Sequence, residues 1–258
     1  MSRLVDLNSD VGESFGEWTL GDDAHVLDYV SSANVACGFH AGDPQVMLQT
    51  VRLAHDRDVA VGAHPGYPDL AGFGRRAMTC TPDEVYAFCL YQIGALAAIC
   101  QAEGVRLSHV KAHGALYNQS ARNTNVARAL AQATRDAAPG LILLGLPGSR
   151  HEAAARELGV PFASEVFADR SYRADGSLVA RSHAGSVLHD PEVIVARVIR
   201  MMTEETIETG HGEIVRVHAD SVCVHGDNPA ALAIVKMVRR GLDGAGVHVG
   251  PLRNVLSL

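Results

Sequence analysis

Short apolar runs that end in polar clusters beside glycine recur along the chain and limit the folds it can adopt. The plainest clusters occupy residues 6–13, 34–44, 61–67, 109–114 and 222–229. Loops that leave parallel strands converge on one face of an α/β protein, and chemistry is usually found there. The sequence therefore predicts one enzyme site assembled from the ends of several strands.

The segments between these runs have helical patterns, so strands and helices alternate. We expect strands near residues 3–8, 32–37, 58–63, 107–112, 141–145, 160–165 and 220–225. This alternation predicts a parallel sheet, open or closed. Capping residues before proline predict helix starts at Asp43-Pro44, Thr81-Pro82, Asp190-Pro191 and Asn228-Pro229.

Two of these helices are expected over 82–103, with a Thr81–Glu84 capping box, and over 190–209. An Asp175-Gly176 turn between short extended runs predicts a hairpin insertion near 172–180.

Length and composition favour one domain spanning residues 1–258. Single α/β barrels commonly reach about 250 residues, and no linker interrupts this 258-residue chain.

The composition also limits the partners and the location of the protein. A net charge of −7 without a basic stripe argues against a nucleic-acid partner. Five cysteines without a C-x-x-C pair favour a reducing compartment. No stretch approaches about 18 uninterrupted apolar residues, so we expect a soluble cytoplasmic protein without a membrane partner.

The first strand combines one polar face with one apolar face. Period-two alternation places Asp6, Asn8 and Asp10 together. Burying such groups without partners costs several kcal/mol, so they must meet a ligand, a metal, water or one another. The alternative is that Asp10 and Glu13 only fix a loop.

Four histidines follow proposed strands: His40, His64, His113 and His225. A single such histidine is more often structural, but four of them predict a shared pocket. Histidine exchanges protons near neutral pH and binds metals, so acid–base and metal chemistry both stay open. Asp43 is interpreted as a helix cap.

Lys111 ends an apolar strand and needs a buried anion or a depressed pKa, which makes it a candidate clamp for carboxylate or phosphate. Glu165, Asp169 and Arg170 follow the sixth strand and belong either to the site or to an ordinary loop ion pair. The sequence contains neither a G-x-x-x-x-G-K-[ST] loop nor a G-x-S-x-G elbow.

Six ordered blocks of sequence resemble the LamB/YcsF family from about residue 3 to 250. They cover residues 6–16, 33–44, 62–69, 110–118, 167–170 and 224–229. Ala112 departs from the proline that the family usually has between Lys111 and His113. The resemblance implies an irregular seven-stranded β/α barrel of the glycoside hydrolase/deacetylase type. It also implies ATP-dependent opening of the 5-oxoproline lactam to L-glutamate, together with two further subunits, B and C.

This activity leads to predicted roles for the candidate residues. Asp10, Glu13 or Glu165 would act as base, while His64 and His113 shuttle protons. The residues expected to orient substrate are Asn8, His40, Lys111, Asp169, Arg170 and His225. ATP with Mg²⁺ is the expected cofactor. Because the chain lacks a P-loop, it either binds ATP unconventionally or leaves it to a partner. A metal in the barrel and a homo-oligomer stay open.

Two rival interpretations remain. In a metal-dependent deacetylase, Asp10, His40 and His64 would bind the ion and activate water. Such enzymes usually place a second histidine four positions after the first, where this chain has Pro44. The other rival is a non-catalytic subunit whose pocket binds a lactam or carboxylate.

Overall fold

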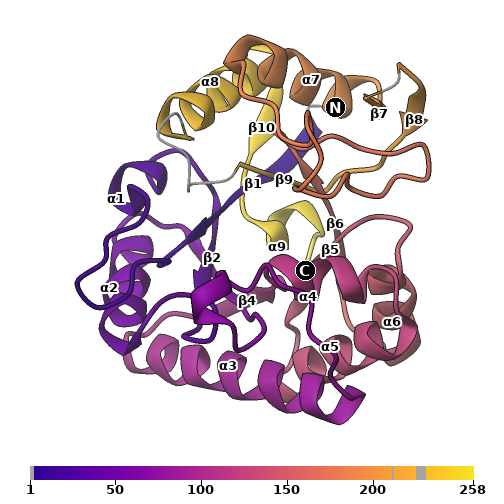
Figure 1. Cartoon of the computed structure of the whole chain (residues 1–258). Helices are drawn as coiled ribbons and strands as arrows, with labels where there is room; N and C mark the ends of the chain where they lie inside the picture. Colours follow the sequence, from indigo (N-terminus) through magenta and orange to yellow (C-terminus); the bar gives the residue numbers. More distant parts are fainter. Residues whose placement is uncertain (1–2, 211, 225–230) are drawn as a thin grey trace.

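A closed barrel of seven parallel strands forms the centre of the protein (Figure 1). The computed structural model describes residues 3–210, 212–224 and 231–258. Around the barrel the strands are β1 (Arg3–Val11), β2 (Ser32–Ala36), β3 (Ala60–His64), β4 (Leu107–Val110), β5 (Ile142–Gly145), β6 (Phe162–Phe167) and β9 (Ser221–Cys223). Strand β9 pairs with both β6 and β1, which closes the ring. The predicted seven-stranded β/α barrel is confirmed.

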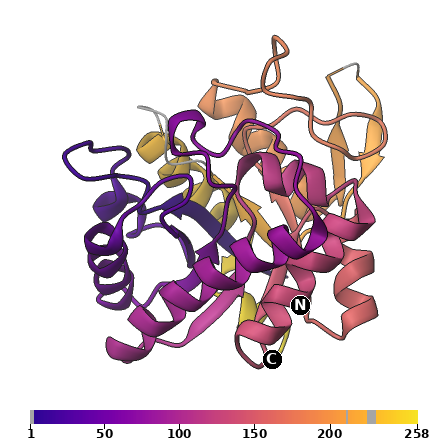
Figure 2. The same ribbon diagram turned by 60° about the horizontal axis from the view of Figure 1, so that its bottom comes forward.

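Helices surround this ring, as the two ribbon views show (Figures 1 and 2). They are α1 (Asp23–Val26), α2 (Pro44–His55), α3 (Pro82–Ala102), α4 (Gly114–Ser120), α5 (Thr124–Ala137), α6 (Arg150–Leu158), α7 (Pro191–Thr203) and α8 (Ala231–Gly244), with a 3-10 turn, η1 (Leu70–Gly72). Asp43, Thr81 and Asp190 cap α2, α3 and α7 as predicted, and Thr81 with Glu84 forms the capping box. The predicted Asn228 cap lies outside the described residues.

The helix predicted over 190–209 is too long, because α7 ends at Thr203. Glu205 adopts a left-handed backbone (φ 54°), and an antiparallel hairpin of β7 (Thr206–Glu208) and β8 (Ile214–Arg216) follows. The β-branched pair Thr206-Ile207 disfavours helix and suits a strand. Burial of Ile207 then favours the hairpin.

A shorter excursion follows β6, where Tyr172 and Leu178 form an antiparallel bridge around a turn. The amide of Arg173 donates to the carbonyl of Ser177 within it.

Helix α3 is long and apolar enough to cross a membrane by length and composition. It packs instead along the barrel wall, beside α5 and β3. One of its stripes, with Val85, Cys89, Ile93 and Leu96, is buried in the core. Packing on the barrel therefore accounts for the apolar residues of this stripe.

The inside of the barrel is polar along β1 and its neighbours. Asp6 accepts hydrogen bonds from Ser31 (2.7 Å), Ser32 (2.6 Å) and Ser221. Burial raises the pKa of Asp6 to about 6, although the hydroxyl donors oppose this shift. Val5 and Leu7 point outward into the main core. The predicted alternation along the first strand is thus present.

The barrel interior beside the amino-terminal ends of β5 and β6 is apolar. Ile142, Leu144 and Ala163 form a cluster with Leu252 of the short C-terminal helix α9 (Leu252–Val255). The preceding strand β10 (Val247–Val249) pairs with Arg3–Val5, the first residues of β1. The C-terminal segment therefore fills the end of the barrel opposite the carboxyl ends of the strands.

Candidate functional site

Lys111, directly after β4, lies at the centre of the polar interior. Its Nζ is 2.9 Å from Asp10 Oδ1, 2.8 Å from Glu165 Oε1, 3.2 Å from Asn8 Oδ1 and 3.2 Å from Cys223 Sγ. Burial alone disfavours the ammonium ion, but Asp10, Cys223 and Glu165 raise the pKa of Lys111 well above its usual value. The side chain is therefore a fixed cation that holds β1, β6 and β9 around β4.

Two asparagines orient the carboxylates around this cation. Asn34 Nδ2 donates to Asn8 Oδ1 (2.7 Å) and to Asp10 Oδ1 (2.9 Å). Asn8 Nδ2 in turn donates to Glu165 Oε1 (3.1 Å) and Ser221 Oγ (2.7 Å). These amide contacts fix Asp10 and Glu165 so that neither carboxylate can turn away from Lys111.

His109 extends the same network and was not among the predicted site residues. Its Nε2 lies 2.8 Å from Asn34 Oδ1, so it donates to that oxygen. Burial lowers the pKa of His109 to about 3, which keeps the ring neutral. Gly62 on β3 leaves room for it, since a Cβ there would lie 2.1 Å from His109 Nε2. The sequence signal was alternation: His109 precedes Lys111 by two residues, as Ser32 precedes Asn34.

His64 and His113 face each other at the carboxyl ends of β3 and β4. His64 Nδ1 lies 2.8 Å from the Lys111 carbonyl, and His113 Nε2 lies 2.8 Å from the Phe73 carbonyl. Each of these nitrogens must donate, because a carbonyl only accepts. The remaining nitrogens, His64 Nε2 and His113 Nδ1, are 3.0 Å apart, and Asp10 Oδ2 lies 3.3 Å from His64 Nε2.

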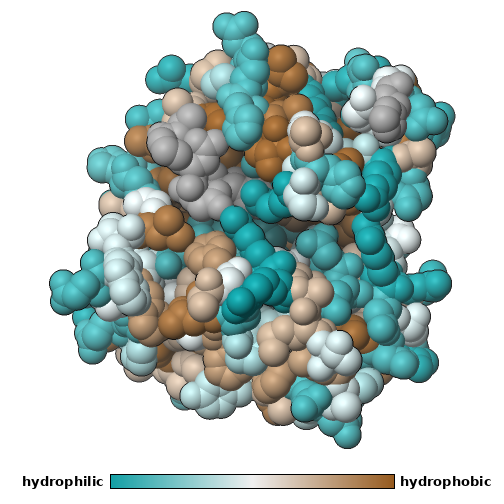
Figure 3. All heavy atoms as spheres, viewed as in Figure 1, coloured by the Kyte–Doolittle hydropathy of each residue, from teal (hydrophilic) through white to brown (hydrophobic). Residues whose placement is uncertain are grey.

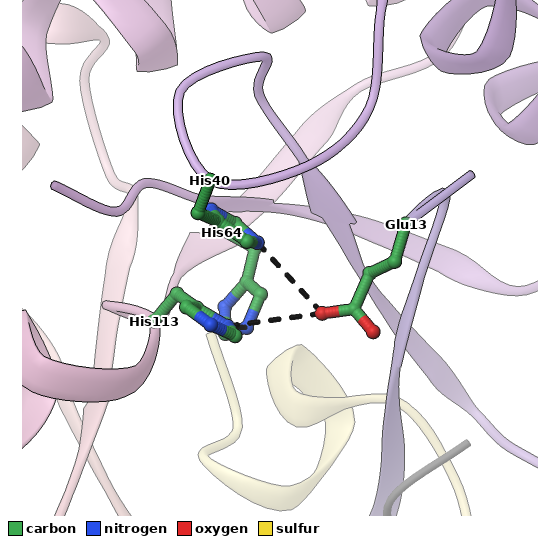
Figure 4. Close-up of side chains that lie close together, drawn as sticks. All are labelled: Glu13, His40, His64 and His113. Carbon is green, nitrogen blue, oxygen red and sulfur yellow. Dashed lines mark hydrogen bonds and ion pairs between the residues drawn. The ribbon is translucent and has the colours of Figure 1, made fainter. Parts of the chain in front are cut away.

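Glu13 and His40 complete this group (Figure 4). Glu13 Oε1 lies 3.7 Å from both His40 Nε2 and His113 Nδ1. The His40 ring stacks on His113, with centroids 3.7 Å apart and planes 5° apart. Burial, followed by the neighbouring histidines, lowers the pKa of both His40 and His113 well below the usual value. Glu13, His40, His64 and His113 are close enough together to be candidate metal ligands.

A cavity of about 360 Å³ opens above this group. Its floor includes Asp10, Glu13, His64, Lys111 and His113, and its wall includes four arginines: Arg75, Arg122, Arg170 and Arg181. On the face of Figure 3, hydrophilic side chains gather around a central hollow. Asp10 and Glu13 are buried, whereas Arg75, Arg122 and Arg181 are more exposed, so cations surround the approach to the carboxylates, which favours anionic ligands.

Arg170 also shapes the wall of this cavity. It donates to the carbonyls of Val179 (2.6 Å) and Ser186 (3.3 Å), which ties down the segment after β6. Burial lowers the pKa of Arg170 to about 10, so it remains a cation at neutral pH.

The predicted site residues that the structure describes divide into those that line the cavity and those that do not. Six of them line the cavity: Asp10, Glu13, His64, Lys111, His113 and Arg170. Asn8, His40 and Glu165 are fully buried behind the lining. Asp169 does not line the cavity either, and its carbonyl accepts the Leu188 amide. His225 lies outside the described residues. Sequence reasoning missed Arg75, Arg122 and Arg181, since single arginines in loops carry no spacing signal.

Together these groups can perform acid–base chemistry on an anionic ligand. Asp10 and Glu13 offer oxygens that accept protons, and the histidine pair can pass a proton between its facing nitrogens. Lys111 and the arginines supply fixed positive charge for a negatively charged group. The fold and the site define a β/α-barrel protein with an acid–base cavity at the carboxyl ends of its strands.

The sequence matches the LamB/YcsF family over residues 5–257, and the chain belongs to that family. It is 52% identical over 248 residues to the 5-oxoprolinase A subunit of Symbiobacterium thermophilum, a match that covers 96% of this chain and 95% of that protein. The crystal structure of a lactam utilization protein from Thermus thermophilus is similar, with a TM-score of 0.91 and 49% identity, and covers 95% of this chain and 98% of that chain.

A more distant likeness concerns the fold alone. The structure of T48 deacetylase with substrate has a TM-score of 0.51 at 13% identity, and covers 99% of this chain and 92% of that chain.

Proposed function

We propose that this chain is the A subunit of an ATP-dependent 5-oxoprolinase, which opens the lactam of 5-oxo-L-proline to L-glutamate in the cytoplasm together with subunits B and C. The similarity to proteins named as the A subunit of 5-oxoprolinase supports this proposal. The observation that carries it is the cavity itself. Its acid–base floor suits ring opening, and its arginine wall suits the carboxylate of 5-oxoproline.

Each part of the floor has a role in this proposal. Asp10 or Glu13 takes a proton from the attacking water, and the His64–His113 pair delivers a proton to the leaving ring nitrogen. Lys111 holds Asp10 in place through its 2.9 Å contact. Asn8, Glu165 and His40 are positioning residues, because they lie behind the lining. One or more of the wall arginines binds the substrate carboxylate.

ATP provides the activation of the lactam amide that the residues of the cavity floor cannot provide. An unactivated amide resists water, and transfer of the terminal phosphoryl group of ATP to its oxygen, with release of ADP, would make the ring carbon a better electrophile. Attack by water with loss of the ring nitrogen then gives γ-glutamyl phosphate, and a second water cleaves this to L-glutamate and inorganic phosphate. The chain has no P-loop, so we assign nucleotide binding with Mg²⁺ to the partner subunits. The arginine wall then serves a second purpose, because fixed cations stabilise a phosphorylated intermediate.

Reconstitution tests this proposal. This chain, purified and combined with its B and C partners, 5-oxoproline and ATP, should produce glutamate, and Asp10→Ala, His64→Ala or Lys111→Ala in this chain should lower the rate at least about 100-fold. Arg128→Ala is the control, because Arg128 lies on the exposed face of α5 and pairs with Glu157. Unchanged glutamate production in all three site variants would show that the assigned site is wrong.

A metal-dependent, deacetylase-like hydrolase is the second candidate, favoured by the Glu13, His40, His64 and His113 group. Here His113, from the end of β4, supplies a nitrogen that the Pro44 position cannot. Hydrolysis of an acetylated substrate without ATP would favour this candidate. Glutamate formation by B and C alone would instead favour a non-catalytic binding role for this chain.

A further inference from the structure

The hydrogen bonds of His64 and His113 direct two lone pairs at one point. In its neutral form each ring carries one proton, and a backbone carbonyl holds that proton on the far nitrogen. His64 Nε2 and His113 Nδ1 therefore face each other as acceptors, 3.0 Å apart. Two lone pairs at this distance repel, so the arrangement calls for a positive species between or beside them.

We propose that a divalent transition-metal ion, with zinc as the first choice, binds here to His64 Nε2, His113 Nδ1 and the Glu13 carboxylate. The donor set of two neutral imidazoles and one carboxylate suits zinc, and catalytic zinc sites commonly keep a further position for water or substrate. All three residues line the cavity, so that position faces the ligand space. The site does not depend on which substrate the cavity accepts. With the ion bound, the proton transfer assigned above to the His64–His113 pair passes to Asp10, whose Oδ2 lies 3.3 Å from His64 Nε2.

The distances fit this assignment without large movements. Bonds of about 2.0 Å at tetrahedral angles place neighbouring donor atoms about 3.3 Å apart. The two histidine nitrogens are separated by 3.0 Å, and His113 Nδ1 is 3.7 Å from Glu13 Oε1. Asp10 Oδ2, 3.3 Å from His64 Nε2, adds a second negative charge at the edge of the site.

The outer contacts of both histidines have the form expected of metal ligands. A metal-binding histidine usually donates its other N–H to a carbonyl or carboxylate, which fixes both tautomer and ring orientation. His64 does so to Lys111 and His113 does so to Phe73. Gly74 leaves space for this arrangement, because a Cβ there would lie 2.8 Å from His113 Cδ2.

His40 is close enough to be a ligand, but its orientation argues against that role. A metal lies near the plane of an imidazole ring that binds it. The rings of His40 and His113 are parallel within 5° and 3.7 Å apart, so one ion cannot lie in both planes. The ring of His40 therefore packs against the ring of His113 and helps to hold it in place. Neither nitrogen of His40 has a hydrogen-bond partner in the described part of the chain.

A proton shared by His64 and His113 is the competing explanation of the 3.0 Å contact. A proton joins only the two nitrogens. An ion also makes use of Glu13, whose Oε1 is 3.7 Å from His113 Nδ1 and too distant for a hydrogen bond. The two explanations differ in whether the chelator-treated protein binds an added ion.

Calorimetric titration of the chelator-treated full chain with Zn²⁺, without substrate or partners, tests the site. We expect one ion per chain. His64→Ala and His113→Ala should each weaken binding at least about 100-fold, since loss of a ligand exceeds the roughly 10- to 100-fold cost of losing a supporting residue. Co²⁺ added to the wild-type chain should give the visible absorption of a nitrogen- and oxygen-ligated ion. His218→Ala, an exposed histidine outside the cavity, should keep wild-type binding.

Two further variants keep the test decisive if an alanine variant fails to fold. Glu13→Gln retains the shape of the side chain and should weaken Zn²⁺ binding at least about 10-fold. His40→Phe retains the stacked ring and should bind within about 3-fold of wild type. The absence of stoichiometric binding by the wild-type chain would overturn the proposal, and loss of binding in His40→Phe would overturn the donor assignment. Because no substrate is present, failure of the proposed function leaves this result intact.

Discussion

At the scale of single residues, Lys111 shows how one buried cation organises several strands. Its Nζ contacts both Asp10 (2.9 Å) and Glu165 (2.8 Å), and the side chain is only 2% exposed, so little water can replace either contact. Removing one partner from a buried charge pair costs far more than the pair itself contributes, because an uncompensated charge remains. Stability and catalysis at this position are therefore coupled.

We expect Lys111→Met to lower the free energy of unfolding by about 3–5 kcal/mol, because two carboxylates lose their counter-ion. Adding Glu165→Gln to that variant should recover part of the loss by removing one of the charges. Urea unfolding of the wild type, both single variants and the double variant measures this coupling. Strictly additive losses would show that Lys111 and Glu165 do not interact energetically.

Asp6 predicts a pH effect on stability rather than on activity. Its pKa is about 6 in the folded protein against 3.8 without burial. The stabilising contribution of the protonated acid is therefore complete below pH 3.8 and is lost as the pH rises through 6. Relative to wild type, Asp6→Asn should gain roughly 2 kcal/mol between about pH 4.5 and pH 7. Urea unfolding at both pH values tests this, and a pH-independent difference would contradict it.

At the scale of elements, the strand and cap signals were good predictors because they are local. Proline after a capping residue fixed the starts of α2, α3 and α7. The predicted end of α7 was wrong: the prediction ran on to residue 209 and included Ile207, whereas the chain turns at Glu205 and Ile207 belongs to β7. A stop without glycine or proline leaves no clear sequence signal.

The contact between β3 and β4 gives a prediction at this scale. Gly62→Ala would place a methyl group 2.1 Å from His109 Nε2, within a network that cannot move freely. We expect a loss of about 1–3 kcal/mol in unfolding free energy, measured by thermal or urea unfolding.

Gly94→Ala in α3 is the matched control, since nothing lies within 4 Å of the added atom. It should be neutral or stabilise the helix by up to about 1 kcal/mol. Equal losses at both glycines would contradict the steric explanation.

At the scale of the whole molecule, sequence reasoning found the polar face of the barrel and Arg170 of its charged wall, but not the other three arginines. Asp10, His64, Lys111 and His113 end strands, so a parallel barrel brings them together wherever the loops go. Arg75, Arg122 and Arg181 meet only because separate loops fold over the same opening. Roles were harder still to predict, because burial behind the lining distinguishes Glu165 from Asp10, and burial depends on packing.

The charged wall predicts discrimination by charge. Arg122→Ala should weaken binding of 5-oxoproline about 10-fold, the effect of one charge-assisted hydrogen bond. Binding of the same five-membered lactam without its carboxylate should change little. Equilibrium binding of both compounds to wild type and variant provides the measurement, and equal weakening for the two would show that Arg122 does not recognise the carboxylate.

The apolar cluster of Leu252 with Ile142, Leu144 and Ala163 affects how small molecules enter and leave the barrel. Because this cluster closes that end of the barrel, the interior of the described part of the molecule is reached from the carboxyl ends of the strands. In the part of the chain that the structure describes, small molecules and any partner protein then use the same opening between the arginines. A partner bound at that opening would have to leave or shift before a product could be released.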